Sequence, residues 1–300
     1  MRRIFLNCGF ALCAATMILS SCERTTELEM AITITPDISS PEFDATIEDG
    51  FSKSSSTRTA ISTTPNAVGN YFLTWNSGDE ISISEGTNVA VYTTKESNQT
   101  ASFTKKSGYI SNTASKYVAF YPASLTPKNQ KLPATQEYVS GDVKNYPMYA
   151  ESNGYELSFK NLCGILRLSL SNTDKEREVS VKSISVSVDG QGLSGNFTVD
   201  ESYAAVVSGA DGVVLNCSTP VAIGTQSSDF NMVMPKGVYA AMKIKITDKE
   251  GKVVNLEGQS PVTVNRSGIT KVNVALKAAN FTNGLEIITF TESDVEFTER

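Results

Sequence analysis

The sequence predicts an all-β protein, and three features from residue 22 onward lead to this prediction. Apolar and polar residues alternate with a period of two in many short segments, as they do in half-buried strands. Clusters of turn-forming residues separate these segments, for example at 76–79, 189–192, 209–212 and 248–251. Helical periodicity of 3.6 residues is almost absent. Many short strands at such spacing are typical of antiparallel β-sandwiches.

Ten segments carry the strand pattern. The clearest is 243–256, where two alternating runs flank the turn sequence Asp-Lys-Glu-Gly and predict a hairpin. In chain order, the segments are 29–38, 71–85, 88–95, 101–106, 116–124, 155–171, 181–190, 202–209, 229–256 and 269–278.

The length of the chain predicts two domains. One sandwich needs about 100 residues, so the residues from 22 to 300 suit two of them. Pro147 and Gly154 bracket a polar break, which is the expected seam. The predicted organisation is a signal segment at 1–21, an N-terminal β-sandwich domain at 22–152 and a C-terminal one at 153–300.

The first 21 residues have the pattern of an export signal. Arg2 and Arg3 precede a mainly apolar run at 4–19, which is shorter than the ~20 residues of a spanning helix. The sequence Leu-Ser-Ser-Cys at 19–22 resembles the lipobox of bacterial lipoproteins. The resemblance implies an acylated Cys22 that anchors the chain in the outer membrane. The alternative is an ordinary signal peptide cut nearby, which would leave Cys22 as a spare thiol.

Charge and composition weigh against several classes of function. Without residues 1–21 the chain has 24 basic and 32 acidic residues, a net charge of −8, which disfavours nucleic acid as a partner. The sequence has no histidine, so it lacks a Ser–His–Asp or Cys–His system and an imidazole metal ligand. Catalysis by two carboxylates stays open in principle. We expect a protein that is not an enzyme, with no catalytic residue, cofactor or metal site.

Two cysteines, Cys163 and Cys217, are left once the signal segment and Cys22 are set aside. An exported protein could join them in a disulfide. Cys163 lies in an apolar run, where a free thiol packs like a small hydrophobic side chain. The sequence favours buried thiols, and the disulfide is the alternative.

The sequence Gly-Gln-Gly-Leu-Ser-Gly at 190–195 matches the G-x-G-x-x-G fingerprint of dinucleotide-binding sites. That fingerprint needs a strand before it and a helix after it, so that the helix N-terminus meets the pyrophosphate. A strand pattern precedes the motif, but residues 196–200 alternate like another strand. We therefore expect these glycines to serve a turn between two strands.

The lipobox is followed, in this order, by the motifs TRTAI, WNSGDEISI, YVAFYPAS, YPMYAES, FKNLCGILRLSL and GLSGNFTVD. Together these motifs resemble those of the fimbrillin-like proteins of type V fimbriae. The resemblance spans nearly the whole chain after residue 22. It implies two transthyretin-like β-sandwich domains in tandem, export as a lipoprotein to the cell surface, and assembly with other fimbrial subunits or with copies of itself. It does not choose between stalk, tip and anchor subunits.

A candidate first strand and a candidate cleavage site follow Cys22. Leu28, Met30, Ile32 and Ile34 share one face of an extended segment. Arg58 lies in a polar stretch of the kind that proteases cut. The family resemblance implies that an arginine-specific protease removes the first strand of polymerising subunits, and Arg58 best matches that position. The alternative is a solvated arginine at the start of a strand.

The C-terminal segment carries a candidate replacement strand. Leu285 and Ile287, then Val295 and Phe297, share one face. Loss of a first strand would bare an apolar groove with unpaired backbone groups, which is a template for another strand. The tail is therefore a candidate donor in strand exchange. The alternative is that it completes its own sheet or frays.

Aromatic residues support a second class of function, a monomeric surface lipoprotein that binds a glycan or a host protein. A row of aromatic side chains could form a stacking platform for sugars. In strands, such residues more often fill a core, so this binding module is the alternative to a fimbrial subunit. The residues are Tyr71, Phe72, Trp75, Tyr117, Phe120 and Tyr121.

Overall fold

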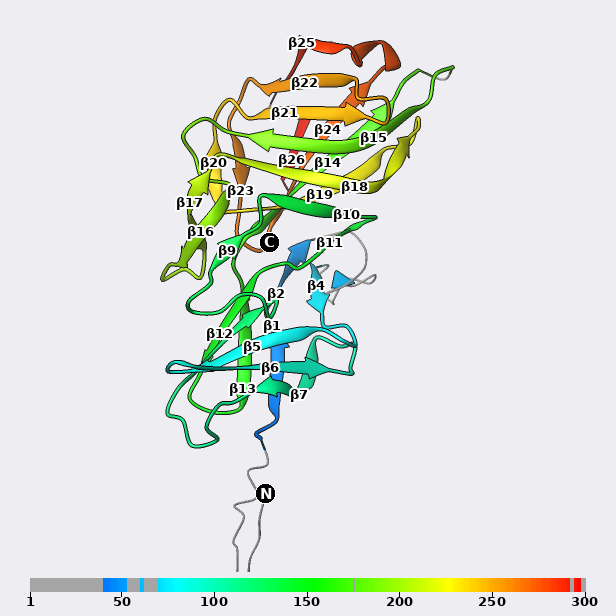
Figure 1. Cartoon of the computed structure of the whole chain (residues 1–300). Helices are drawn as coiled ribbons and strands as arrows, with labels where there is room; N and C mark the ends of the chain where they lie inside the picture. Colours follow the sequence, from blue (N-terminus) through cyan, green and yellow to red (C-terminus); the bar gives the residue numbers. More distant parts are fainter. Residues whose placement is uncertain (1–39, 53–59, 62–69, 175, 292–293, 298–300) are drawn as a thin grey trace, which may run out of the picture. The chain divides into compact units, whose positions relative to one another are not determined.

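The computed structural model describes residues 40–52, 60–61, 70–174, 176–291 and 294–297 (Figure 1). Within these residues the protein is nearly all β, which confirms the predicted fold class. The helical content of the described part is one short 3-10 turn, η1 (Ala278–Asn280). The predicted first strand at 28–34 lies outside the described residues.

The strands are short, and most are joined by turns or brief loops. In chain order they are β1 (Phe43–Ile47), β2 (Asp49–Ser52), β3 (Ala60–Ile61), β4 (Asn70–Thr74), β5 (Glu80–Glu85), β6 (Asn88–Thr94), β7 (Thr100–Gly108), β8 (Tyr117–Tyr121), β9 (Lys131–Leu132), β10 (Thr135–Val139), β11 (Asp142–Val143), β12 (Met148–Ser152), β13 (Glu156–Asn161), β14 (Gly164–Asn172), β15 (Val179–Ser187), β16 (Ser194–Val199), β17 (Ala205–Ala210), β18 (Gly212–Ile223), β19 (Ser228–Met234), β20 (Gly237–Tyr239), β21 (Lys243–Asp248), β22 (Val253–Gly258), β23 (Val262–Val264), β24 (Ile269–Leu276), β25 (Asn283–Phe290) and β26 (Val295–Phe297).

The first large sheet is a closed barrel with the strand order β1-β13-β12-β8-β5-β6-β7. Its inward-facing apolar residues form one buried cluster. Trp75 is fully buried in that cluster, and its ring makes edge contacts with Phe103, Tyr121 and Phe159 at centroid distances of 5.0–5.5 Å. Its Nε1 donates a 2.8 Å hydrogen bond to the carbonyl of Ala45, which ties the core to β1.

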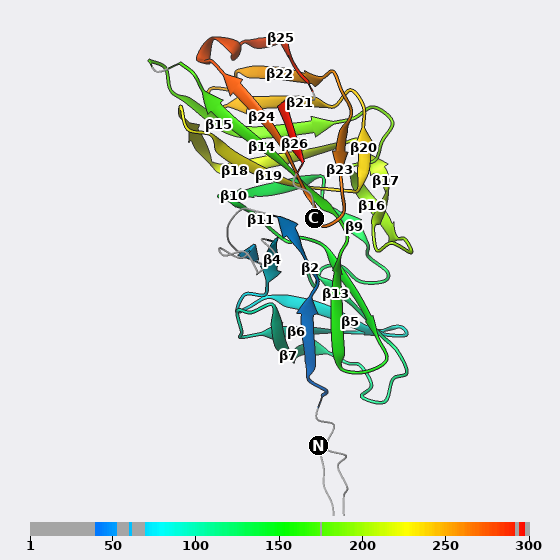
Figure 2. The same cartoon turned by 180° about the vertical axis from the view of Figure 1, so that it is seen from behind.

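Two further sheets, built mainly from strands that follow β13, form two layers, as Figures 1 and 2 show from opposite sides. One has seven strands in the order β11-β10-β18-β15-β21-β22-β25, and the other has four in the order β19-β14-β24-β26. Apolar residues of both layers, such as Leu168 of β14 and Ile184 of β15, share one buried cluster. Two sheets that enclose a common core form a β-sandwich.

Two local predictions are confirmed. The segment 243–256 forms the antiparallel hairpin of β21 and β22, with Thr247 opposite Val253. Gly190 and Gly192 lie in the connection from β15 to β16, Gly195 lies in β16, and in the described residues this motif is followed by strand and not by helix. Gly190 and Gly195 have φ of 74° and 110°, and a Cβ on Gly195 would lie 2.9 Å from the Gly209 Cα. These glycines therefore serve a turn and a close approach of two strands.

The structure adds pairings that the sequence pattern did not indicate. Four strand pairs are parallel in the described part: β1 with β13, β10 with β18, β14 with β24, and β22 with β25. Parallel neighbours require long connections, so local alternation does not reveal them. Strands β12 and β13 flank the predicted boundary at 152–153 and pair with each other, and that boundary stays a prediction.

Candidate functional site: the strand that closes the barrel

Strand β1 closes the barrel. It pairs antiparallel with β7, where Phe43 lies opposite Phe103, and parallel with β13, where Ile47 lies opposite Phe159. Figure 1 shows β1 in blue beside β13 in green. Because the sheet is a closed ring, β1 is the single strand that separates the edges of β7 and β13.

The side chains of β1 alternate strictly between core and surface. Phe43, Ala45 and Ile47 are fully buried, whereas Asp44 and Thr46 are exposed. This pattern follows from the period of two in a strand with one buried face. Complete burial of Phe43 and Ile47 stabilises the closed barrel by about 1.5–3 kcal/mol for each side chain.

Phe43 is surrounded by tyrosines. Its ring makes edge contacts with Tyr92, Tyr117 and Tyr155 at centroid distances of 5.1, 5.1 and 5.4 Å. Burial raises the pKa of Tyr92 to about 12, and its hydroxyl has no hydrogen-bond partner among the described residues. Removal of β1 would therefore uncover a wall of tyrosine rings.

A carboxylate follows β1 directly. The Glu48 side chain is 12% exposed, and its Oε1 accepts hydrogen bonds from Arg266, from the amide of Asn161 at 2.8 Å and from Ser267 Oγ at 3.0 Å. Lys160 Nζ lies 3.6 Å from Glu48 Oε2. The end of β1 is thus held by charge as well as by apolar packing.

The residues of the predicted first strand and its flanks lie outside the described part of the chain. These are Cys22, Leu28, Met30, Ile32, Ile34 and Arg58.

Sequence analysis missed β1. Its signal was the alternation Phe-Asp-Ala-Thr-Ile at 43–47, hidden in a stretch interpreted as polar. This strand lies between Cys22 and Arg58, so a cut after Arg58 would separate it from the rest of the chain.

The candidate donor residues lie on strands that the tail adds to its own sheets. Strand β25 is the edge strand beside β22, and β26 is the edge strand beside β24. Ile287 is 60% exposed, whereas Phe290 on the same strand is buried. Leu285 belongs to β25, and Val295 and Phe297 belong to β26. The alternative considered for the tail, pairing within its own sheets, is the arrangement that the structure describes.

The aromatic platform does not form at four of its six positions. Trp75, Tyr117, Phe120 and Tyr121 are each at most 4% exposed and belong to the barrel core. The side chains of Tyr71 and Phe72 are outside the described set. The expectation that these aromatic residues fill a core is confirmed for the four of them.

Both remaining cysteines are free and buried, as predicted. Cys163 belongs to the barrel core and Cys217 to the sandwich core. Burial raises the pKa of the Cys163 thiol well above its usual range and that of Cys217 to about 11. Neither thiol is a nucleophile at neutral pH.

The described residues contain no cluster of three or more acidic, cysteine or histidine side chains that could hold a metal ion. No helix in the described part has the length and apolarity to span a bilayer.

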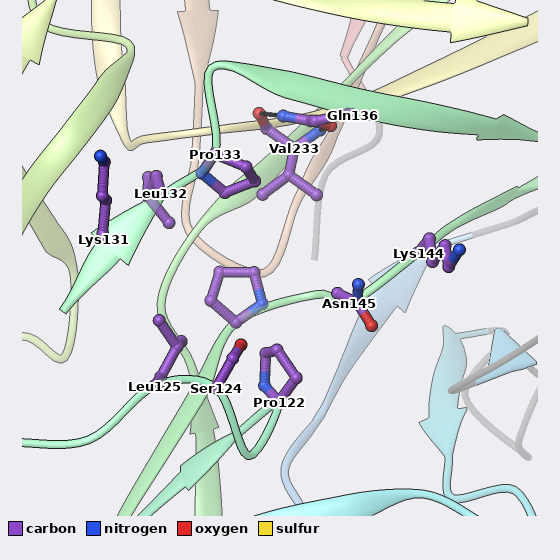
Figure 3. A pocket seen from close by; sticks show the side chains of 11 residues that line it. Pro122, Ser124, Leu125, Lys131, Leu132, Pro133, Gln136, Lys144, Asn145 and Val233 are labelled. Atoms are coloured by element: carbon purple, nitrogen blue, oxygen red, sulfur yellow. Dashed lines mark hydrogen bonds between the residues drawn. The ribbon is translucent and has the colours of Figure 1, made fainter. Parts of the chain in front are cut away.

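One cavity of about 190 Å³ lies beside the loop after β8 (Figure 3). Proline and aliphatic side chains line it, with Lys131 and Lys144 among the polar lining residues. The Gln136 side chain is engaged in hydrogen bonds to the protein backbone: its Nε2 donates to the Val233 carbonyl and its Oε1 accepts from the Val233 amide, both at 2.8 Å. The cavity is smaller than the 300 Å³ or so of typical ligand pockets.

Comparisons with known proteins identify the fold. No family model and no curated protein matches the chain. A candidate cell adhesion protein from Bacteroides ovatus aligns over 86% of this chain and 96% of its own, with 12% identity and a TM-score of 0.50. Another from Bacteroides fragilis aligns over 87% and 98%, with 10% identity and a TM-score of 0.41. The tip fimbrial protein Mfa3 from Porphyromonas gingivalis, truncated at its C-terminus, aligns over 86% and 99%, with 7% identity and a TM-score of 0.32.

The similarity to the Bacteroides ovatus protein spans most of both chains, and at this identity it shows a shared fold. The all-β fold shared with that protein agrees with the fold class that the resemblance to fimbrillin-like proteins implies.

Proposed function

We propose that this chain is a structural subunit of a cell-surface fimbria that supports adhesion. In this proposal the chain is exported as a lipoprotein, anchored in the outer membrane through Cys22, and assembled by exchange of β-strands. The observation that carries the proposal is the position of β1, which joins β7 to β13 in the closed barrel and lies before Arg58 in the sequence. The fold shared with a candidate cell adhesion protein supports a surface role.

The first step of the proposed assembly is a cut after Arg58. Residues 22–58 would then be held to the rest of the chain by non-covalent contacts, which in the described part include the pairing of β1 with β7 and β13 and that of β2 with β4. Departure of β1 leaves the paired residues 100–103 of β7 and 156–159 of β13 without their ladder partner. Two unpaired edges that flank an aromatic wall form a template for an incoming strand.

The second step is donation of the tail by another subunit, either a second copy or a related chain. Within the described residues, strands β25 and β26 each pair with one neighbour, so release of the tail breaks one ladder in each of their sheets. Leu285, Ile287, Val295 and Phe297 would enter the acceptor. Burial of four such side chains contributes on the order of 6–12 kcal/mol before ordering costs.

A polymerisation assay tests the proposal. Treatment of the full chain with an arginine-specific protease should yield a product that begins at Thr59 and forms detergent-resistant ladders. Arg177 lies in an exposed turn between β14 and β15 and is a competing site, so every variant carries Arg177→Lys.

The matched control for that assay is Arg58→Lys, which keeps the charge and resists the protease. This variant should stay uncut and monomeric, and deletion of residues 284–300 should leave a cut but monomeric chain. Cut chains that begin at Thr59, keep an intact tail and still remain monomers would refute strand exchange.

A further inference from the structure

The carboxylate of Glu48 occupies a site built by residues that do not belong to its own strand. Lys160 and Asn161 end β13, and Arg266 and Ser267 lie in the loop between β23 and β24. These segments are 112 to 219 residues away from Glu48 in the chain. Departure of β1 would therefore remove the carboxylate and leave its four partners behind.

The site is held in place by contacts that do not involve Glu48. Arg266 Nη1 donates to the Asn161 carbonyl at 2.8 Å, and Asn161 Nδ2 donates to Ser267 Oγ at 3.1 Å. The Ser267 amide donates to the Cys163 carbonyl at 2.9 Å. Asn161 and Ser267 are buried, and Arg266 is 15% exposed. A vacated site would keep its donors aimed at the same point.

An empty site of this kind is costly. Two cations, a backbone N–H and a hydroxyl would lose the oxygen atoms that now accept from them or neutralise them. In the intact chain the Arg266 side chain is 15% exposed and the Lys160 side chain 35% exposed. Arg266 would keep the Asn161 carbonyl and Ser267 would keep Asn161 Nδ2, but the loss of the carboxylate from partly buried donors and cations is destabilising. A strand that brings a carboxylate to the same register would restore these contacts, whereas one that brings an amide or an apolar residue would not.

We infer that the residues around Glu48 form a carboxylate-recognition site that selects the strand replacing β1. The inference rests on the proposed strand exchange and names its selectivity determinant. The occupant is the acidic tail of a second copy of this chain. Residues 283–300 contain one basic residue, Arg300, and five acidic ones interspersed with apolar residues. The acidic residues are Glu286, Glu292, Asp294, Glu296 and Glu299.

A peptide-binding assay tests the inference without relying on Arg58 as the natural cleavage site. In the full chain, residues 54–57 are replaced by the recognition sequence of a protease that cuts nowhere else. After the cut, a labelled peptide of residues 41–52 is exchanged into the barrel, and its displacement is followed by fluorescence anisotropy.

We expect the affinity of the peptide for the barrel to depend on the charge of Glu48 and not on that of Asp44. The Glu48→Gln peptide should bind about 10- to 100-fold more weakly than the wild-type peptide, the range for loss of a charge-assisted hydrogen bond. The Asp44→Asn peptide is the matched control, because Asp44 is exposed on the same strand and accepts from Ser102 Oγ at 2.5 Å. It should bind within twofold of the wild type.

Variants of the chain locate the effect. Arg266→Met should bind the wild-type and Glu48→Gln peptides with nearly equal affinity, and Lys160→Met, at a more exposed position, is a second variant if the first does not fold. A peptide of residues 283–300 should displace the labelled peptide. Replacement of its five acidic residues by Gln or Asn should lower the affinity of this tail peptide at least tenfold.

Two outcomes would overturn the inference. Equal affinity of the unaltered barrel for the wild-type and Glu48→Gln peptides would show that the site does not distinguish a carboxylate from an amide. A site that distinguishes these peptides but ignores the tail peptide would exclude the tail as its occupant. Failure of the natural chain to be cut at Arg58 would change neither measurement, so it counts against the proposed function alone.

Discussion

The first strand and the last two strands of the described chain are bound to their sheets in different ways. Strand β1 lies between two neighbours, buries every apolar side chain completely and ends in an ion pair with Arg266. Strands β25 and β26 lie at sheet edges, and β25 leaves Ile287 exposed. The barrel therefore depends on its terminal strand, whereas the sandwich core is enclosed mainly by other strands. Such a difference suits an acceptor that needs a cut and a donor that can be released without one.

The largest expected effect is loss of the Phe43 ring. Phe43→Ala should lower the free energy of unfolding of the intact chain by about 3–5 kcal/mol, because it leaves a cavity among three tyrosine rings. Denaturant unfolding followed by tryptophan fluorescence measures it, since Trp75 reports on the same core. A loss below about 1 kcal/mol would mean that β1 does not seal the barrel.

Loss of the Glu48 carboxylate should have the next largest effect. Glu48→Ala should cost about 3 kcal/mol, because Arg266 and Lys160 stay partly buried without their anion. Asp44→Asn, on the exposed face, should change stability by less than about 0.5 kcal/mol. If the two substitutions lower the free energy of unfolding equally in the same assay, the ion pairs of Glu48 do not help to hold β1.

Alkaline pH should weaken the sandwich core through Cys217. Burial raises the pKa of this thiol to about 11, so the folded protein holds a proton that the unfolded chain releases near pH 9. The stabilisation is complete below pH 9 and is lost as pH rises towards 11, at up to about 1.4 kcal/mol per pH unit. Cys217→Ala should flatten this part of the stability profile, and an unchanged slope would contradict the assignment.

The smallest effect belongs to the tail. Ile287→Ala should change the stability of the monomer by less than about 0.5 kcal/mol, because the side chain is 60% exposed. The same substitution should weaken the ladders that form after proteolysis, if Ile287 enters an acceptor. A large loss of monomer stability would place this residue in its own sandwich core and remove it as a donor.

The sequence predicted what depends on local pattern. Alternation in 243–256 gave the hairpin, the glycines at 190–195 gave a turn, and the apolar run around Cys163 gave a buried thiol. Each of these features follows from residues within one segment, so periodicity and turn chemistry suffice to reveal it.

The parts that sequence did not reveal depend on distant residues. Strand β1 is five residues long, and it closes the barrel by pairing with residues 156–159, which lie more than 100 residues further along the chain. The Glu48 site joins segments up to 219 residues apart. Alternation shows that a strand has a buried face but does not say which strands flank it. Closure of the barrel therefore became visible only in the structure.

Hydrogen exchange before and after removal of β1 tests the central claim most directly. In the intact chain, protection from exchange is expected for the amides that pair with β1 in residues 100–103 and 156–159. Their exchange should become at least 100-fold faster once residues 22–58 are removed. Addition of the tail peptide should restore the protection. Residues 243–248 of the sandwich should keep their protection throughout. Unchanged protection of β7 and β13 after proven loss of β1 would contradict the account.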